Sequence, residues 1–156
     1  MPPVGAALNL SPHFTLEELV TNGNHPDIPN DLPEGWQERI QTVANKLEKV
    51  RGILGVPLHI SYGYRSPALN AACGGSETSD HMQALAVDFN PVGISRGDAF
   101  RKLWEDESFM VSVDQMILER GCIHIGLGSR VRHEGRGDRP YPLLAVWPKP
   151  LPAFLR

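Results

Sequence analysis

The clearest regular pattern in the chain is a stripe of apolar residues between positions 36 and 54. The stripe residues recur at steps of three and four, the spacing of one face of an α-helix. They are Trp36, Ile40, Val43, Leu47, Val50 and Leu54. Gly55 and Pro57 follow, and residues of these types end helices. The pattern therefore predicts an amphipathic helix over residues 36–54.

Two shorter segments also carry helix signals. In FTLEEL, Thr15 precedes Glu18 by three residues, which is the spacing of a capping box at a helix N-terminus. In SPALNAAC, Ser66 can cap a helix whose first residue is Pro67. Residues 21–35 contain three prolines and two glycines, which predicts a loop.

The remaining apolar segments indicate strands and one further helix. Predicted strands are LHISY (58–62), LAVDF (85–89), QMIL (115–118) and CIHIGL (122–127), because each is short and rich in β-branched or other apolar residues. GDAFRKLWEDE (97–107) places Phe100 and Trp104 on one side of a helix.

This order of elements predicts an α+β fold, with helices packed on a small, mainly antiparallel sheet. No internal repeat or long linker divides the 156 residues, so we expect a single domain over residues 1–156. Its core is expected over residues 11–137. The proline-rich tail, 138–156, is expected to pack on the surface in extended form.

Composition excludes several classes of protein. The formal net charge of −3 argues against nucleic acid or an anionic membrane as the main partner. Two cysteines are too few for a disulfide scaffold or a cysteine-rich zinc finger. No apolar run reaches the roughly 18 residues of a membrane span, and the N-terminus lacks the basic start of a signal peptide. We expect a soluble protein made in the cytoplasm.

Three residues are candidates for a metal site. Asp88 and His124 lie inside short apolar strands, and His81 ends a Gly- and Ser-rich loop. A carboxylate in such a strand is costly to bury unless it is paired or bound to a metal. Two histidines and one aspartate could hold a catalytic zinc with a fourth position for water. Spacing alone favours the other interpretation, two core histidines and a capping aspartate.

The wider pattern changes this interpretation. YGYRSPALNAACGGSETSDHMQALAVDF followed by DQMILERGCIHIGL resembles the zinc D-alanyl-D-alanine peptidase family. That family includes D,D-carboxypeptidases, D-Ala-D-Ala dipeptidases and phage endolysins that cut L-alanyl-D-glutamate links. The shared parts are Tyr64-Arg65-Ser66, Gly74-Gly75, Ser79-x-His81, Asp88 and Ile123-His124. SPHFTLEEL is similar to the opening helix of the phage-type branch, and the resemblance covers about residues 11–127.

The resemblance implies the fold of the hedgehog and D-Ala-D-Ala peptidase group and a role for each matching residue. It implies that His81, Asp88 and His124 bind one Zn²⁺ per chain. Arg65 would stabilise the oxyanion, which suits a guanidinium fork. Ser79 and Tyr64 would contact substrate, although a capping role for the Ser79 hydroxyl is an equal alternative.

Three positions depart from the family pattern. The usual glycine three residues after the first histidine is Ala84, a change that we expect to tighten packing. The family commonly has an aromatic residue two positions before the last histidine, and this sequence has Cys122 there. We interpret Cys122 as a buried thiol rather than a zinc ligand. Several branches of the family have an acidic residue three positions before that histidine, and this sequence has Gly121 there.

The general base is therefore assigned to Glu119, the nearest carboxylate. In one continuous strand, its odd offset from His124 would point it to the other face, but Arg120-Gly121 could form a turn that re-aims it. A surface salt bridge is the alternative for Glu119. Reserve candidates for the base are Glu77, Asp80 and Glu134. His133 lies in a basic stretch that could line a cleft or form a solvated loop.

The expected function is a zinc metallopeptidase, of the D,D-carboxypeptidase or L-alanyl-D-glutamate endopeptidase type. Its substrates would be peptidoglycan stem or cross-link peptides that contain D-amino acids. We expect a monomeric phage or prophage endolysin that acts on the cell wall after release with a holin. The alternatives are an inactive zinc-stabilised wall-binding or phage structural module, and a hydrolase of some non-wall amide.

Overall fold

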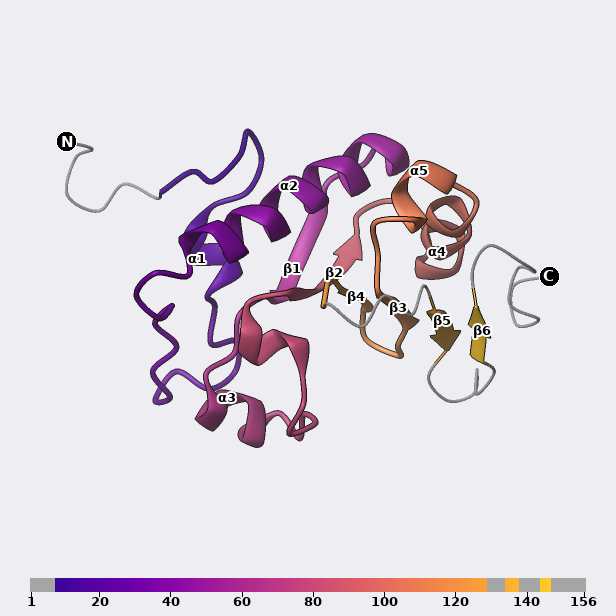
Figure 1. Cartoon of the computed structure of the whole chain (residues 1–156). Helices are drawn as coiled ribbons and strands as arrows, with labels where there is room; N and C mark the ends of the chain where they lie inside the picture. Colours follow the sequence, from indigo (N-terminus) through magenta and orange to yellow (C-terminus); the bar gives the residue numbers. More distant parts are fainter. Residues whose placement is uncertain (1–7, 129–133, 138–143, 147–156) are drawn as a thin grey trace.

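The computed structural model describes residues 8–128, 134–137 and 144–146, the last two segments by their backbone alone. Its helices are Leu16–Leu19 (α1), Gln37–Leu54 (α2), Pro67–Ala72 (α3), Arg96–Trp104 (α4) and Glu107–Met110 (α5), and a 3-10 helix covers Asp80–Gln83 (η1). The strands are Leu58–Tyr62 (β1), Ala86–Pro91 (β2), Gln115–Leu118 (β3), Ile123–Gly126 (β4), Glu134–Gly137 (β5) and Leu144–Val146 (β6) (Figure 1).

The strands form one sheet in the order β1-β2-β4-β3-β5-β6. All neighbours pair antiparallel except β3 and β5, which are parallel. Helices α2 and α4 contact each other and strand β2, whereas α3 lies on the other side of the sheet in Figure 1. The predicted α+β class, with helices on a mainly antiparallel sheet, is confirmed. No helix of the described residues is long and apolar enough to cross a bilayer.

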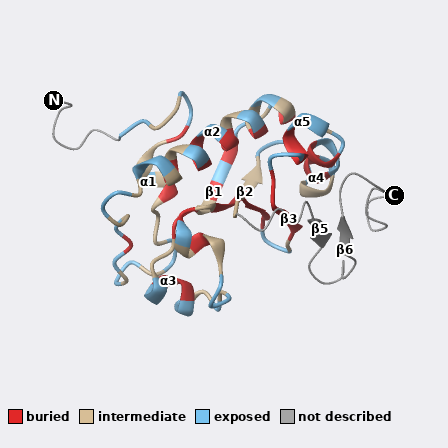
Figure 2. Ribbon diagram, viewed as in Figure 1, coloured by how far each residue is buried: buried red, intermediate tan, exposed pale blue. Residues whose placement is uncertain are grey.

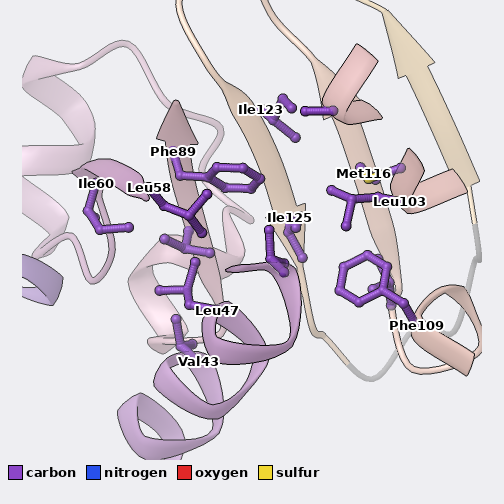
Figure 3. Packing of buried hydrophobic residues seen from close by; sticks show 14 of the residues in the cluster. Val43, Leu47, Leu58, Ile60, Phe89, Leu103, Phe109, Met116, Ile123 and Ile125 are labelled. Carbon is purple, nitrogen blue, oxygen red and sulfur yellow. The ribbon is translucent and has the colours of Figure 1, made fainter. Parts of the chain in front are cut away.

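The core lies between α2 and one face of the sheet. The predicted stripe is buried from Ile40 to Leu54, and Trp36 packs at its margin (Figure 2). Figure 3 shows Val43 and Leu47 of α2 facing strand residues such as Leu58 and Ile125. Because side chains alternate along a strand, the residues between these core positions point to the opposite face. That face is free to carry polar chemistry.

Local signals are confirmed at two predicted helix starts. The Thr15 side chain accepts from the Glu18 backbone N–H at 3.3 Å, and the Ser66 hydroxyl accepts from the Leu69 N–H at 3.2 Å. Gly55 ends α2 in the left-handed conformation. These residues mark the start of α1, the end of α2 and the start of α3.

Two parts of the structure differ from the sequence prediction. Helix α5 was not predicted, because four residues are too short for a periodic pattern; Asp106 caps it by accepting from the Phe109 N–H at 2.9 Å. Residues 134–137 and 144–146 form strands β5 and β6, which the sequence pattern did not predict. Strand β5 pairs with the edge of β3 and β6 pairs with β5, so sheet pairing decides their conformation. The rest of the tail and His133 lie outside the described residues.

Candidate metal centre and active site

Strand register brings Asp88 and His124 together on the face opposite the core. Asp88 of β2 pairs with His124 of β4, which in turn pairs with Ile117 of β3. Their strand neighbours Val87, Phe89, Ile123 and Ile125 belong to the hydrophobic core. The alternation that buries these apolar residues therefore directs the carboxylate and the imidazole into the opposite surface.

His81 reaches the same point from the 3-10 helix η1. The Ser79 hydroxyl caps this helix by accepting from the His81 backbone N–H at 3.2 Å. The His81 carbonyl accepts from the Arg65 N–H at 3.0 Å, which ties the turn to the end of β1. The His81 residue is 2% exposed. Local capping and one long-range backbone bond thus hold the imidazole in place.

The Gly63 carbonyl binds the His81 ring nitrogen that faces away from Asp88 and His124. This carbonyl lies 2.7 Å from His81 Nδ1 and can only accept, so Nδ1 carries a hydrogen, while Nε2 faces Asp88 and His124. A Cβ atom on Gly63 would lie 2.4 Å from the Leu19 carbonyl oxygen. Only glycine therefore allows the chain to pass close to α1 at this point, and this approach fixes the carbonyl that selects the His81 tautomer.

Three ligand-type atoms meet at the centre of this face. His81 Nε2 lies 3.1 Å from Asp88 Oδ1 and 3.2 Å from His124 Nδ1, and His124 Nδ1 lies 2.8 Å from Asp88 Oδ1. Ligands of a tetrahedral zinc with bonds of about 2.0–2.1 Å are separated by about 3.3 Å. The three atoms therefore fit one small divalent ion.

The chemistry of the donor set also fits a metal ion. Imidazole nitrogen and carboxylate oxygen are common zinc ligands in proteins. His81 Nε2 and His124 Nδ1 both face the same oxygen of Asp88, so the two imidazoles and the carboxylate converge on one point.

Arg65 holds the other oxygen of Asp88. Arg65 Nη2 donates to Asp88 Oδ2 at 2.9 Å, and the guanidinium lies over the Tyr62 ring at 4.6 Å. Burial by itself raises the pKa of Asp88, but His81 and His124 outweigh it and hold this pKa well below its usual range. Asp88 is therefore a carboxylate, with one oxygen for the imidazoles and one for Arg65.

Glu119 faces the same site, and the strand geometry explains why. Its N–H donates to the Cys122 carbonyl at 2.9 Å, so Glu119 and Cys122 are partners across a hairpin whose loop is Arg120-Gly121. Cross-strand partners point to the same face, and Cys122 shares a face with His124. Ligand atoms of Glu119, Asp88 and Cys122 lie within 4.8 Å of one another. Glu119 lies five residues before His124, and this odd spacing would place the two side chains on opposite faces only if they belonged to one uninterrupted strand. The hairpin loop between them removes that restriction.

A cleft of about 650 Å³ opens over this centre. It is lined by Arg65, Cys73, Gly74, Gly75, Ser76, Thr78, Ser79, Asp80, His81, Asp88, Gln115, Ile117, Glu119 and His124. The wall over residues 73–80 comes from the loop before η1, and the opposite wall comes from the outward face of β3. An extended peptide could therefore lie between this loop and the sheet.

The other candidate residues lie in different surroundings. Tyr64 is not among the residues that line the cleft: it is 4% exposed and packs edge-on against Trp36 at 6.0 Å between ring centroids, and substrate contact stays a prediction for it. Ser79 lines the cleft and caps η1, so substrate contact stays a prediction for it. Glu77 is exposed and outside the cleft lining, Asp80 lines the cleft, and the Glu134 side chain lies outside the described residues.

Cys122 is a buried free thiol, and its role was only partly visible from sequence. Its Sγ donates to Glu119 Oε2 at 3.2 Å. Burial, together with the charges of Asp88 and Glu119, raises the pKa of this thiol. These surroundings favour the protonated thiol, and the thiol contacts the Glu119 carboxylate. A hairpin interpretation of Arg120-Gly121 would have placed these two side chains together.

Ala84 lies in an unusual backbone conformation. It ends η1 with φ 54° and ψ 38°, in the left-handed region, and it is the one non-glycine residue with positive φ among the residues described. Glycine would adopt this conformation at no steric cost, whereas alanine is strained by about 1 kcal/mol. The departure from glycine therefore adds backbone strain, and its expected effect on packing stays a prediction.

This strain leads to a prediction for the stability of the metal-free protein. Ala84→Val is expected to destabilise it by at least about 3 kcal/mol, because a β-branched side chain is strained at this φ and the site is fully buried. Ala84→Gly is expected to change stability by less than about 1 kcal/mol, since relief of strain offsets the lost methyl group and the added backbone entropy. Urea unfolding measures both, and a fully stable valine variant would contradict the assigned conformation.

A buried set of two histidines and a carboxylate at the bottom of an open cleft is the arrangement of a metal-dependent hydrolase. The family model for Peptidase M15 matches residues 12–126, most of the chain, and the chain therefore belongs to this family of zinc metallopeptidases. The match ends at the last residue of β4, so it includes all three donor residues, Arg65 and Glu119. No curated protein matches the chain significantly.

Proposed function

We propose that the chain is a zinc-dependent peptidase that hydrolyses peptidoglycan stem or cross-link peptides containing D-amino acids. The observation that carries the proposal is the convergence of His81 Nε2, Asp88 Oδ1 and His124 Nδ1 within 3.2 Å of one another, with Glu119 and Arg65 in the same cleft. Membership of the Peptidase M15 family supports the reaction class.

In this proposal His81, Asp88 and His124 hold the zinc, which polarises the peptide carbonyl and activates water when it is bound. Glu119 takes a proton from the attacking water and delivers it to the leaving amine. Arg65 fixes the Asp88 carboxylate through Nη2 and keeps a permanent positive charge beside the oxyanion. The loop over residues 73–79 positions the peptide against the sheet.

We further propose that the chain is a phage or prophage endolysin that reaches the wall with the help of a holin. The resemblance of residues 11–19 to the phage-type branch supports this part of the proposal. Expression in a host together with a holin should lyse the cells, whereas expression of either protein alone should not. Lysis that needs no peptidase would contradict the endolysin role but not the reaction.

Metal removal tests the central proposal. Treatment with a chelator is expected to stop the release of peptides or new amino groups from purified peptidoglycan, because the three donor residues alone cannot polarise the scissile carbonyl. Added Zn²⁺ should restore hydrolysis and Mg²⁺ should not, since imidazole ligands suit zinc. Mass spectrometry of the soluble products measures the reaction and identifies the bond.

The same experiment separates the alternatives. An inactive zinc-stabilised module would bind one zinc per chain and release nothing from walls of several chemotypes. A hydrolase of non-wall amides would cleave small amides and leave stem peptides intact. Either result would overturn the proposed function.

A further inference from the structure

The carboxylate of Glu119 is held by a contact that comes from this chain's departure from the family pattern. The resemblance implies an aromatic residue at position 122, and here Cys122 donates its thiol hydrogen to Glu119 Oε2 at 3.2 Å. The carboxylate can only accept, so the thiol is the donor. Cys122 is 7% exposed, and an ion–dipole contact is stronger in such surroundings than in water.

The backbone beneath this contact is fixed from two sides. Asn90 of β2 donates from Nδ2 to the Gly121 carbonyl at 2.8 Å, and Arg96 of α4 donates from Nη2 to the Arg120 carbonyl. The Glu119 N–H bonds to the Cys122 carbonyl at 2.9 Å. The hairpin loop therefore cannot shift easily, and the freedom that remains to Glu119 is rotation of its side chain.

A glutamate side chain has three rotatable bonds and loses considerable entropy when it is held in one position. No other side-chain hydrogen bond of Glu119 occurs among the described residues. Its carboxylate lies within 4.8 Å of both the Asp88 carboxylate and Cys122 Sγ. Repulsion from Asp88 would drive Glu119 out of the cleft, and the thiol contact opposes this movement.

We propose that Cys122 is a positioning residue that holds Glu119 in the orientation in which it can exchange protons with water and the leaving amine. The inference rests on the proposed function, in which Glu119 is the general base. Cys122 itself touches neither substrate nor metal in this proposal. It acts through one hydrogen bond to the carboxylate.

Three variants test the inference on zinc-loaded protein with a stem-peptide substrate. Cys122→Val removes the donor and replaces the thiol with a slightly larger apolar side chain, and is expected to lower kcat about tenfold with KM unchanged. Cys122→Ser keeps a donor and is expected to stay within about threefold of the parent kcat. Leu118→Val is the matched control, since Leu118 is buried in the core on the other face of the hairpin and loses only packing.

The outcomes decide between positioning, metal binding and a structural role. Cys122→Val with parental kcat would overturn the proposal, and so would loss of zinc from both Cys122 variants, which would make the thiol a ligand. A kcat that falls equally in Cys122→Val, Cys122→Ser and Leu118→Val would reveal a packing effect and overturn it as well. If Glu119→Gln stays active, the general-base assignment has failed. If Glu119→Gln is inactive and Cys122→Val is not affected, only the inference about Cys122 has failed.

Discussion

Replacing Asp88 with alanine is expected to abolish zinc binding and peptide hydrolysis together. Asp88 Oδ1 lies within 3.1 Å of both imidazole nitrogens, and Oδ2 accepts from Arg65 at 2.9 Å. Its removal takes away the only anionic donor of the triad and leaves the Arg65 charge without its partner. Breaking a buried ion pair in this way costs about 3–5 kcal/mol, so the metal-free protein should also unfold more easily.

Metal analysis, hydrolysis and urea unfolding measure the three consequences separately. Asp88→Asn is the closer replacement, because it keeps the shape and loses the charge; it should fold better than the alanine variant and still bind zinc at least about tenfold more weakly than the parent. Asp98→Ala serves as the control, since Asp98 lies exposed on α4 and forms an ion pair with Arg101 at 3.7 Å. One tightly bound zinc per chain in Asp88→Ala would show that the metal lies elsewhere.

Asp88 and His124 could be singled out because each carries a cost that the sequence makes visible, whereas the metal role of His81, Asp88 and His124 was implied by the resemblance to the peptidase family. A charged residue inside AVDF and a histidine inside CIHI are unfavourable in a core unless they face away from it or bind something. Alternation within each strand then gives the face. The pairing of Asp88 with His124 could not be predicted in the same way, because register between distant strands depends on packing of the whole sheet.

Other features could not be predicted for equally local reasons. Tyr64 was expected to contact substrate through the resemblance of Tyr64-Arg65-Ser66, and the motif does not reveal that its ring packs against Trp36. The sequence likewise does not reveal that Ala84 adopts a φ of 54°. Residues 134–137 carry no strand pattern and become a strand by pairing with β3. In each case, tertiary contacts or backbone geometry outweighed residue type.

Replacing Glu119 with glutamine is expected to lower kcat by about 10²–10⁴-fold and to leave zinc binding intact. Glutamine keeps the length of the side chain and can still contact Cys122, but its amide cannot take a proton from water at neutral pH. The three donor atoms of His81, Asp88 and His124 are not altered, so metal analysis should still give one zinc per chain. KM should change little, because the lost step is proton transfer rather than peptide binding.

Two comparisons make the Glu119 result specific. Glu77→Gln removes an exposed carboxylate of the neighbouring loop, outside the cleft lining, and should hydrolyse at the parental rate. Asp80→Asn tests the remaining carboxylate that lines the cleft, and a loss as large as that of Glu119→Gln with zinc retained would transfer the role of base to Asp80. The hairpin geometry argues for Glu119, because pairing with Cys122 places its carboxylate on the metal face within 4.8 Å of the Asp88 carboxylate. A glutamine variant that keeps more than half of the parental kcat would mean that this carboxylate, although correctly placed, transfers no proton in the rate-limiting step.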